Sequence, residues 1–471
     1  MQAVQLQLPI LNGIYADSTP DFRTSYPKNL IPVPKSTGIS EGYLRPADGV
    51  VEGGAGPGVG RGGISWKGTL YRVMGTRLVS IADDNTITEI GDVGAGNRVT
   101  FDYGFTYLAI ASGGRLYLYD GTTLAQVTDE DLGIALDVVW ADGYYMTTDG
   151  ESLVVTELND SFAVSPLKYG SSESDPDPVK GLLRLGREVY ALNRHTIEVF
   201  SNVGRTGFPF QHIPGAQVQK GTIGTHANCI FMGGVAFLGG GRNEAISIYM
   251  GANGSAQKIA TREIEEIIST YTESELEQAF LEERTDKAHQ FLIVHLPNHT
   301  LVFDGAASQA LGLPVWFSLS SALVGDGKWS ANSLIRCYNR WNVCHCDTNQ
   351  FGHLDDTVSS HWGIDVGWEF GTQIVYNKSN GAIFHEIELT ALTGQVAFGA
   401  SPTIWTQYSS DGETWSVEEP IGAGKLGERA KRLVWLQQGN MRNWRIQRFR
   451  GTSEAHLAVA ALGVRLEPLN V

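Results

Sequence analysis

A short β-strand pattern recurs seven times between residues 69 and 346, and it constrains the fold more than any other feature of the chain. Each copy is a run of four or five residues, most of them rich in Leu, Val, Ile and Tyr, and the starts are 46, 37, 36, 59, 53 and 42 residues apart. A period of about 40–50 residues that holds several short strands is typical of β-propeller blades. We therefore predict an all-β fold with a propeller of about seven blades. The copies are Thr69–Val73, Arg115–Tyr119, Ser152–Thr156, Glu188–Leu192, Ser247–Met250, Thr300–Asp304 and Asn342–Cys346.

Hairpin signals lie beside these segments. Ile64–Trp66, Tyr107–Ala111 and Val138–Trp140 are each followed by a glycine-containing turn and a second strand-like run, which is the pattern of a β-hairpin. The two longest intervals contain insertions, a loop at Ser201–Gln219 and a helical segment. Because insertions blur the count, six or eight blades also agree with the sequence.

The helical segment covers about 261–283. Its apolar residues fall near one stripe at helical spacing. Thr272 and Glu275 resemble a capping box, so the segment is either one helix or two short ones. We expect it to pack on its own domain or to dock on a partner.

Both ends of the chain differ from the repeat region. Residues 1–50 are rich in proline, which excludes helix and central strand, and we predict an extended arm on this subunit or a neighbouring one. Residues 51–63 form a glycine-rich segment that lacks the strand-loop-helix context of a phosphate loop, so we interpret it as a linker. We assign residues 51–360 to the propeller. Longer alternating strands follow, and we assign residues 361–471 to a β-sandwich-like domain.

The net charge of −16 argues against sequence-specific DNA contacts, which need Lys and Arg. It is compatible with a wall along which DNA passes without binding. No apolar stretch approaches the length of a membrane span, and the N-terminal sequence lacks the features of a secretory signal. Four cysteines in 471 residues do not make a disulfide framework, which favours a reducing cytoplasm.

Cys337, Cys344, His345 and Cys346 form a cluster of the residue types that bind zinc in proteins. The spacing matches no common zinc module, and successive strand residues point to opposite faces. We therefore predict small buried hydrophobic cysteines, with no metal and no cofactor.

The sequence contains no recognisable catalytic motif. Gly-x-Ser-x-Gly and His-Glu-x-x-His are both absent, and no nucleophile and base occur in a familiar context. Tyr408–Trp415 resembles the Asp-box hairpin of sialidases, one residue short, and that hairpin is a structural turn. We predict that the chain is not an enzyme.

A basic strand near the C-terminus stands out in this acidic chain. Arg442, Arg445, Arg448 and Arg450 interleave with Trp444 and Phe449. Arg and Trp are frequent anchors of protein interfaces. The strand is either a contact surface or an exposed face with ordinary charges.

Three segments resemble one family. They are Ser25–Lys35 with its continuation to Gly42–Arg45, Ile264–Leu276, and Phe291–Asp304 followed by Ser308 and Gln309. All are similar to the tail hub of short-tailed, P22-like phages (podophages), also called the packaged-DNA stabilisation protein or tail accessory factor. The order and spacing fit across most of the chain, and the similarity weakens beyond about residue 320.

The resemblance implies a structural virion protein, made in the bacterial cytoplasm and located in the virion tail. It implies a homo-hexamer, added after DNA packaging below the portal and its adaptor ring (the head-to-tail connector). This ring would continue and help to seal the DNA channel, stabilise the packaged DNA, and carry the tailspikes or tail fibres and the tail needle. DNA would pass without sequence-specific binding, and no membrane is involved.

Our candidate contact surfaces are the proline-rich arm, the helical segment and the basic strand. The candidate interface residues are Tyr26, Pro27, Tyr43, Leu44, Arg45, Tyr271, Arg442, Trp444, Arg445 and Arg448.

Two other functions agree with a propeller. A glycan-binding or glycan-degrading tail enzyme of the sialidase or lyase type predicts several Asp boxes and an acid/base pair in a central pocket. A peptide-binding scaffold propeller predicts Trp-Asp signatures, and that dipeptide does not occur in the chain.

Overall fold

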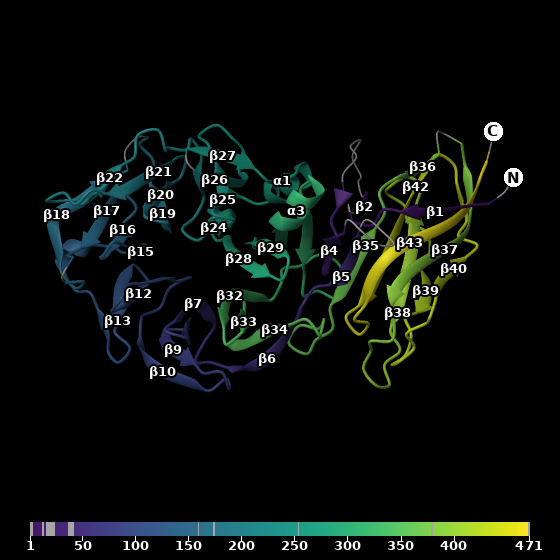
Figure 1. The fold of residues 1–471 in the computed structure, drawn as a ribbon, viewed down its shortest axis with the longest axis horizontal. Coiled ribbons are helices and arrows are strands. Elements are labelled where there is room, and N and C mark those ends of the chain that lie inside the picture. The colour runs from purple at the N-terminus through teal and green to yellow at the C-terminus, as the bar shows by residue number, and fades with distance from the viewer. Residues whose placement is uncertain are drawn as a thin grey trace.

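The computed structural model describes residues 3–11, 14–15, 24–35, 42–158, 160–172, 175–252, 254–377 and 380–469. A ring of small sheets and a two-sheet sandwich lie side by side along the longest axis of the molecule (Figure 1). Of the predicted N-terminal arm, residues 1–2, 12–13, 16–23 and 36–41 lie outside the described residues.

The ring is a β-propeller, and within the described residues it has seven blades of four or five antiparallel strands. Blades 1 to 4 use consecutive strands: β7 (Gly60–Trp66), β8 (Thr69–Met74), β9 (Arg77–Ile81) and β10 (Ile87–Asp92); β11 (Thr100–Tyr103), β12 (Leu108–Ser112), β13 (Arg115–Tyr119) and β14 (Leu124–Gln126); β15 (Asp137–Ala141), β16 (Tyr144–Thr148), β17 (Ser152–Thr156) and β18 (Val164–Ser171); β19 (Val179–Leu185), β20 (Glu188–Asn193), β21 (Ile197–Asn202) and β22 (Phe210–His212).

Blades 5 to 7 follow the same plan, with one extra short strand in blade 5 and one strand from the N-terminal part in blade 7. They contain β23 (Gly221–Thr222), β24 (Asn228–Phe231), β25 (Gly234–Gly240), β26 (Ser247–Ala252) and β27 (Ser255–Lys258); β28 (Phe280–Asp286), β29 (His289–His295), β30 (Thr300–Asp304) and β31 (Trp316–Leu319); β32 (Ala331–Cys337), β33 (Arg340–His345), β34 (Gln350–Asp355) and β6 (Gly49–Ala55).

The seven repeated segments fall in seven different blades, which confirms the predicted propeller. They occupy the second or third strand of each sheet, where both faces are covered by neighbouring blades. These strands are therefore almost continuously buried, as in β13 and β30. The spacing is uneven because the segment is the second strand in some blades and the third in others.

Blade 7 closes the ring with a strand from the other end of the propeller sequence. β6 pairs antiparallel with β34, from Gly49 opposite Asp355 to Ala55 opposite Gln350. The prediction that residues 51–63 form a linker is therefore wrong, because most of this glycine-rich segment belongs to β6 and β7. A Cβ atom on Gly60 would lie 2.5 Å from the Cys344 sulfur, so glycine is required for the close packing of blades 1 and 7.

The second domain is a β-sandwich, whose larger sheet has the order β4-β5-β43-β37-β40 and whose smaller sheet has the order β35-β42-β38-β39. Short strands extend both sheets. The strands are β1 (Val4–Leu8), β4 (Leu30–Pro34), β5 (Gly42–Pro46), β37 (Ala382–Leu392), β40 (Leu433–Leu436), β41 (Asn440–Met441) and β43 (Ala458–Pro468) in the larger sheet, and β35 (Gly367–Gly371), β36 (Val375–Tyr376), β38 (Thr403–Ser409), β39 (Glu419–Gly422) and β42 (Trp444–Thr452) in the smaller one.

The described N-terminal strands belong to this sandwich and do not extend freely. β1 pairs with β43 over Leu462–Leu466, and β5 meets the same strand at Val459. β4 is the edge of the sheet, as expected for a strand with two prolines. The only other N-terminal strands, β2 (Ile14–Tyr15) and β3 (Thr24–Ser25), form a separate pair within the described residues.

The helical segment is two short helices and not a helix over 261–283. α1 covers Arg262–Ser269, and α2 covers Glu273–Leu276 with the capping box between Thr272 and Glu275 in place. Residues from Phe280 onward form β28, because Leu281 enters the core between blades 5 and 6. A third helix, α3 (Gly305–Leu311), was not predicted.

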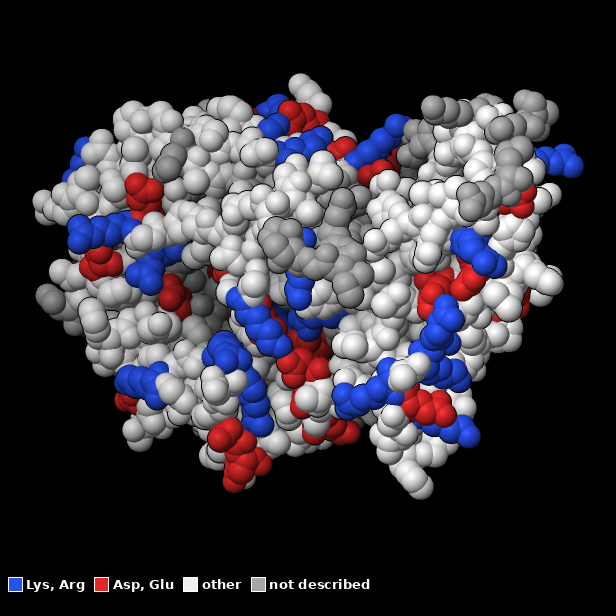
Figure 2. All heavy atoms as spheres, turned by 45° about the vertical axis from the view of Figure 1, so that its right-hand side comes forward, with Lys and Arg blue, Asp and Glu red and all other residues white. Residues whose placement is uncertain are grey.

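Hydrophobic clusters lie between adjacent blades and inside the sandwich. Val73 of blade 1 and Ile110 of blade 2 share one cluster, and Met146 of blade 3 and Ala191 of blade 4 share another. Burial of a side chain the size of Val, Ile or Met contributes about 1.5–3 kcal/mol relative to leaving it exposed. On the face turned forward in Figure 2, Lys and Arg side chains gather over the sandwich.

Candidate functional site

The propeller and the sandwich are joined by the N-terminal segment. The Lys28 amide donates to the Glu369 carbonyl of the sandwich, and the Asn29 amide donates to the Ser318 carbonyl of blade 6, each at 2.9 Å. Leu30 packs in the core of the sandwich, whereas Ile31 packs against blades 6 and 7. Because successive strand residues point to opposite sides, one strand serves both domains.

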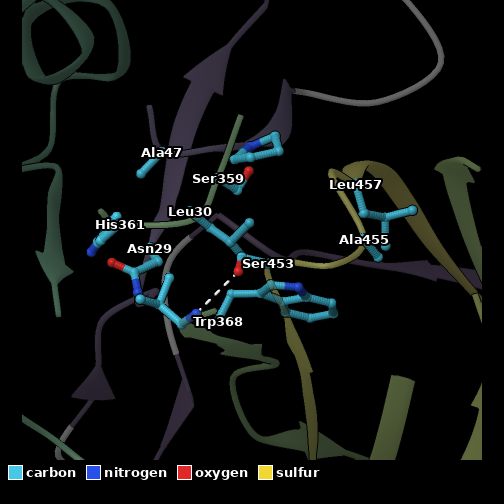
Figure 3. A pocket seen from close by; sticks show the side chains of 11 residues that line it. Asn29, Leu30, Ala47, Ser359, His361, Trp368, Ser453, Ala455 and Leu457 are labelled. Atoms are coloured by element: carbon cyan, nitrogen blue, oxygen red, sulfur yellow. Dashed lines mark hydrogen bonds between the residues drawn. The ribbon is translucent and has the colours of Figure 1, made fainter. Parts of the chain in front are cut away.

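Asn29 fastens this junction with its side chain. Its Nδ2 donates to the carbonyl oxygens of Ser320 (2.7 Å) and Gly367 (2.8 Å), and its Oδ1 accepts from the Ser320 amide (2.9 Å). The backbone φ is +53°, a left-handed conformation that asparagine tolerates. Asn29 lines a cavity of about 10 Å³ with Leu30 and Trp368 (Figure 3), room for about one water molecule.

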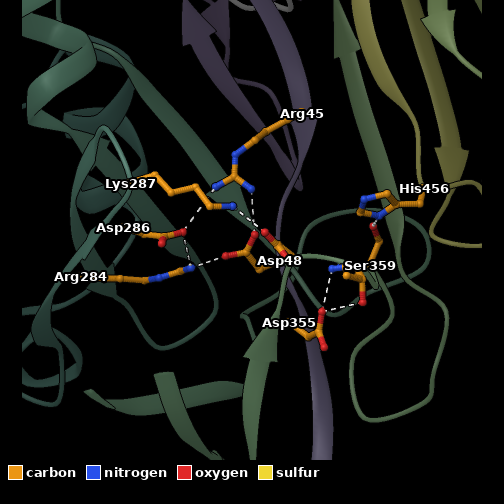
Figure 4. Close-up of polar contacts among 10 residues, drawn as sticks. Arg45, Asp48, Arg284, Asp286, Lys287, Asp355, Ser359 and His456 are labelled. Atoms are coloured by element: carbon orange, nitrogen blue, oxygen red, sulfur yellow. Dashed lines mark hydrogen bonds and ion pairs between the residues drawn. The ribbon is translucent and has the colours of Figure 1, made fainter. Parts of the chain in front are cut away.

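A buried ionic network lies on the propeller side of the junction (Figure 4). Asp48 accepts from Arg284 and from Arg45 (2.8 Å), and Asp286 accepts from Arg284 (3.1 Å). Burial acts to raise the pKa of Asp48, but the two guanidinium groups outweigh it and the pKa is lowered. Asp48 is therefore ionised, and the network ties the N-terminal segment to β28.

A serine–histidine contact closes the other side. Ser359, in the connection between the domains, hydrogen-bonds through Oγ to Nδ1 of His456 in the sandwich at 2.6 Å (Figure 4). Burial lowers the pKa of His456, so the imidazole is neutral near pH 7. A hydrolytic triad also needs a carboxylate that orients the histidine. Among the described residues no carboxylate hydrogen-bonds to His456, so we assign the pair a structural role.

The axis of the propeller holds a cavity of about 1100 Å³. The Arg98 guanidinium lies 3.6 Å from the centre of the Phe280 ring, and that ring stacks on His295 at 4.2 Å. Glu282 forms an ion pair with Arg98 (3.2 Å) and a hydrogen bond with Nε2 of His295 (3.1 Å). These four side chains contact one another, so this part of the wall is braced by an ion pair and stacked rings.

The cysteine cluster divides between two environments. Cys337 and Cys344 are buried in the core between blades 1 and 7, as predicted. Cys346 is half-buried, and its sulfur lies with the ligand atoms of His345 and Asp347 within 4.8 Å of one another. The Lys328 ammonium, 2.7 Å from Asp347, already neutralises that carboxylate, and so the geometry does not favour a cation.

The predicted contact residues of the arm lie largely inside the chain. The Tyr26 hydroxyl hydrogen-bonds to Thr261 at 2.6 Å, Pro27 is buried, and Leu44 has no exposed surface. Arg45 belongs to the Asp48 network. Only Tyr43, which lies under the Lys35 ammonium at 4.9 Å, keeps a partly exposed ring without such a role. The prediction of Pro27 and Leu44 as interface residues is therefore wrong, because both are buried within this chain and stabilise its fold.

The basic strand is also partly internal. Arg445 is 1% exposed because it donates to Gln447 and Gln438 and lies over the Tyr408 ring at 3.8 Å. Burial lowers the pKa of Arg445 to about 10. It is therefore a core residue, which corrects its assignment to an interface.

The remaining candidates are closer to the surface. Arg448 pairs with Glu369 and stacks on Trp415, and Trp444 is half-buried. Arg442 is exposed. Tyr271 is half-buried and hydrogen-bonds to His299. None of these four is excluded from a contact surface by burial.

The Asp-box-like hairpin is a turn, as predicted. Asp411 accepts from the Thr414 hydroxyl and from the amides of Thr414 (2.8 Å) and Glu413 (3.0 Å), and these bonds lower its pKa. It lies between β38 and β39 of the sandwich, away from the propeller axis. No helix in the described residues combines the length and apolar character that a membrane crossing requires.

These features define a class of protein: a propeller locked to a sandwich, in which the described polar clusters stabilise the junction and the axis. Two family models extend the assignment. The model described as "Bacteriophage P22 Gp10, beta-propeller" matches residues 6–359, and the one described as "Bacteriophage P22 Gp10, beta-sandwich" matches residues 367–467. The chain belongs to the bacteriophage P22 Gp10 family, a family of structural phage tail proteins and not of enzymes.

Individual relatives agree with this assignment. The tail hub protein gp10 of Salmonella phage P22 is 28% identical over 485 residues, which cover 98% of this chain and 99% of that protein. Among solved structures, the match to the Neurospora crassa Pan2 WD40 domain has 10% sequence identity and a TM-score of 0.41, and it covers 65% of this chain and 94% of that domain. The match to the N-terminal domain of Nup159 has 9% sequence identity and a TM-score of 0.40, and it covers 70% of this chain and 99% of that domain. The similarity to these two structures is too low to support a functional argument.

Proposed function

We propose that the chain forms a hexameric tail hub that attaches below the portal–adaptor complex of a short-tailed phage. There it continues and helps to seal the DNA channel, stabilises the packaged DNA, and carries tailspikes and a tail needle. The observation that carries the proposal is the family match over both domains, together with end-to-end similarity to a protein named as a tail hub.

The charge and the dimensions support this function. A cavity of about 1100 Å³ is the size of a small-molecule pocket, so DNA would run along the axis of the ring of subunits and not through a propeller. With a net charge of −16 per chain, the ring would repel phosphates and let DNA slide. Tyr43, Tyr271, Arg442, Trp444 and Arg448 remain our candidate contacts with neighbouring tail components.

The test is the mass of the full-length protein, alone and after mixing with particles assembled without it. Six chains of 51.2 kDa give about 307 kDa, and we expect six copies per particle vertex in the mixed sample. A protein that stays monomeric and never associates with the particles would refute the proposal. A gain of genome retention by the mixed particles would support the sealing role specifically.

A further inference from the structure

The negative charge of the chain is concentrated in one blade. The segment that leads into, forms and leaves blade 3, residues 127–178, contains twelve acidic residues and one lysine. Conversely, residues 425–450 of the sandwich contain eight basic residues and one glutamate. Blade 3 and the sandwich lie at opposite ends of the longest axis, with the rest of the propeller between them (Figure 1).

The acidic residues of blade 3 gather beside exposed apolar side chains. The Tyr169 hydroxyl donates to the Asp131 carbonyl, and its pKa is raised by burial and by the carboxylates of Asp131 and Asp149. Leu167, two residues earlier on β18, is 80% exposed. We call the surface formed by Glu130, Asp131, Asp149, Glu151, Leu167 and Tyr169 the blade-3 face.

The sandwich offers the complementary surface on two adjoining loops. The Gly427 amide donates to the Gly394 carbonyl at 3.1 Å and thereby holds the two loops together. Phe398 is 94% exposed on one loop, and Leu426 is 56% exposed on the other. We call Phe398, Leu426, Lys425, Arg429 and Lys431 the loop face.

The cations of the loop face are available to a partner. Lys425, Arg429 and Lys431 are exposed, and they make no ion pair within the part of the chain that the structure describes. Arg432, by contrast, is held by Glu388 at 2.7 Å. An exposed aromatic ring on a loop that adjoins a second loop with three exposed cations resembles the anchors of protein interfaces.

From this complementarity we infer that the loop face of one copy binds the blade-3 face of the next copy, head to tail. This contact rests on the proposed ring and identifies where the ring closes. Opposite surfaces at opposite ends of a subunit make a heterologous interface, which forms a closed ring when the rotation between copies closes. The many like charges on each blade-3 face also oppose pairing of two identical faces, which favours this orientation.

The contact can be observed directly by zero-length carbodiimide cross-linking of particles that carry the full-length protein. The reagent joins a carboxylate to an amine that touches it, so we expect peptides with Glu130 or Glu151 joined to Lys425 or Lys431. Because the two faces lie at opposite ends of one chain, such a product links two copies. A six-copy ring whose inter-copy cross-links all lie elsewhere would overturn this inference and leave the ring standing, whereas particles without a multimer would overturn both.

Charge exchange gives an independent test. Glu130→Lys with Glu151→Lys, and separately Lys425→Glu with Lys431→Glu, should each weaken assembly on the particles by at least about tenfold, since each places like charges opposite one another. The four changes together should restore assembly to within about threefold of the original protein. Because all four side chains are exposed, the unfolding temperature of each variant should stay unchanged.

The control is Asp83→Lys with Glu89→Lys on blade 1, where both carboxylates are also exposed. It changes the net charge as much as the blade-3 variant does, and it should assemble normally. Equal weakening by this control, or failure of the fourfold variant to recover, would refute the proposed contact.

Discussion

Removing the side chain of Asn29 should loosen the junction between propeller and sandwich. Asn29→Ala deletes three hydrogen bonds, to the Ser320 amide, the Ser320 carbonyl and the Gly367 carbonyl. At a net value of about 1 kcal/mol each, their loss destabilises the junction by roughly 3 kcal/mol. Alanine at φ +53° adds about 1 kcal/mol of backbone strain, for a sum of roughly 4 kcal/mol.

Asn29→Gly separates the two contributions. Glycine loses the same hydrogen bonds but adopts the left-handed conformation without strain, so it should destabilise the junction by about 1 kcal/mol less than alanine. Amide hydrogen exchange is the appropriate assay, because it measures opening at particular sites. In the alanine variant the protection of the Ser320 amide should fall by about three orders of magnitude, since about 1.4 kcal/mol corresponds to a factor of ten.

The reasoning would be wrong if both variants kept the protection of Ser320, or if alanine and glycine gave equal values. The first result would mean that water takes over the hydrogen bonds of the Asn29 side chain at no cost in free energy. The second would mean that the backbone at residue 29 leaves the left-handed conformation in the alanine variant. Amides in the centre of blade 3, far from the junction, serve as the internal reference and should be unaffected.

Three further predictions concern single residues. Burial lowers the pKa of His361 to about 4, below the value of about 6.5 in the unfolded chain. Between these two pH values the His361 imidazole is protonated in the unfolded state but neutral in the folded state. The free energy of unfolding therefore falls as the pH drops from about 6.5 towards 4. In His361→Gln the loss of stability between pH 7.5 and pH 5, measured by urea unfolding, should shrink by about 2 kcal/mol, and an unchanged loss would contradict the assignment. Arg445→Ala should lower the free energy of unfolding by roughly 3 kcal/mol, because it removes a buried side chain together with its hydrogen bonds. Arg442→Ala, at an exposed position, should change the free energy of unfolding by less than about 0.5 kcal/mol. Equal effects of the two substitutions would contradict the burial of Arg445. Thr272→Ala removes the capping box of α2 and should lower the free energy of unfolding by about 1 kcal/mol, measured by thermal unfolding. An unchanged unfolding temperature would mean that packing alone stabilises the helix.

The sequence predicted those parts of the fold that depend on local patterns. The inner strands of the blades are recognisable because both of their faces are covered, which leaves runs such as Leu116–Tyr119 without polar alternation. The capping box of Thr272 was likewise visible, because its two partners are three residues apart. The end of the helical segment was not, since Leu281 is drawn into β28 by blades that lie elsewhere in the sequence.

The candidate site was less predictable, because its partners are distant in the sequence. The proline content correctly excluded a central strand at 30–34, but nothing local indicates that Leu30 faces one domain and Ile31 the other. The burial of Arg445 depends on Tyr408 and Gln438. A strand rich in arginine therefore resembles an exposed surface until its neighbours are known.

The pairing of β1 and β5 with β43 also affects the synthesis of the chain. Between Pro46 and Ala458 the ribosome adds more than 400 residues, which takes about 20–80 s at about 5–20 residues per second. For that time β1 and β5 exist without their final partner β43, while the propeller that lies between them in the sequence is already being completed. Unpaired strands are prone to join the wrong chain, and Pro32, Pro34 and Pro46 remove the amide hydrogens that such pairing needs. The prolines thus protect the nascent chain during the interval before its last strand emerges.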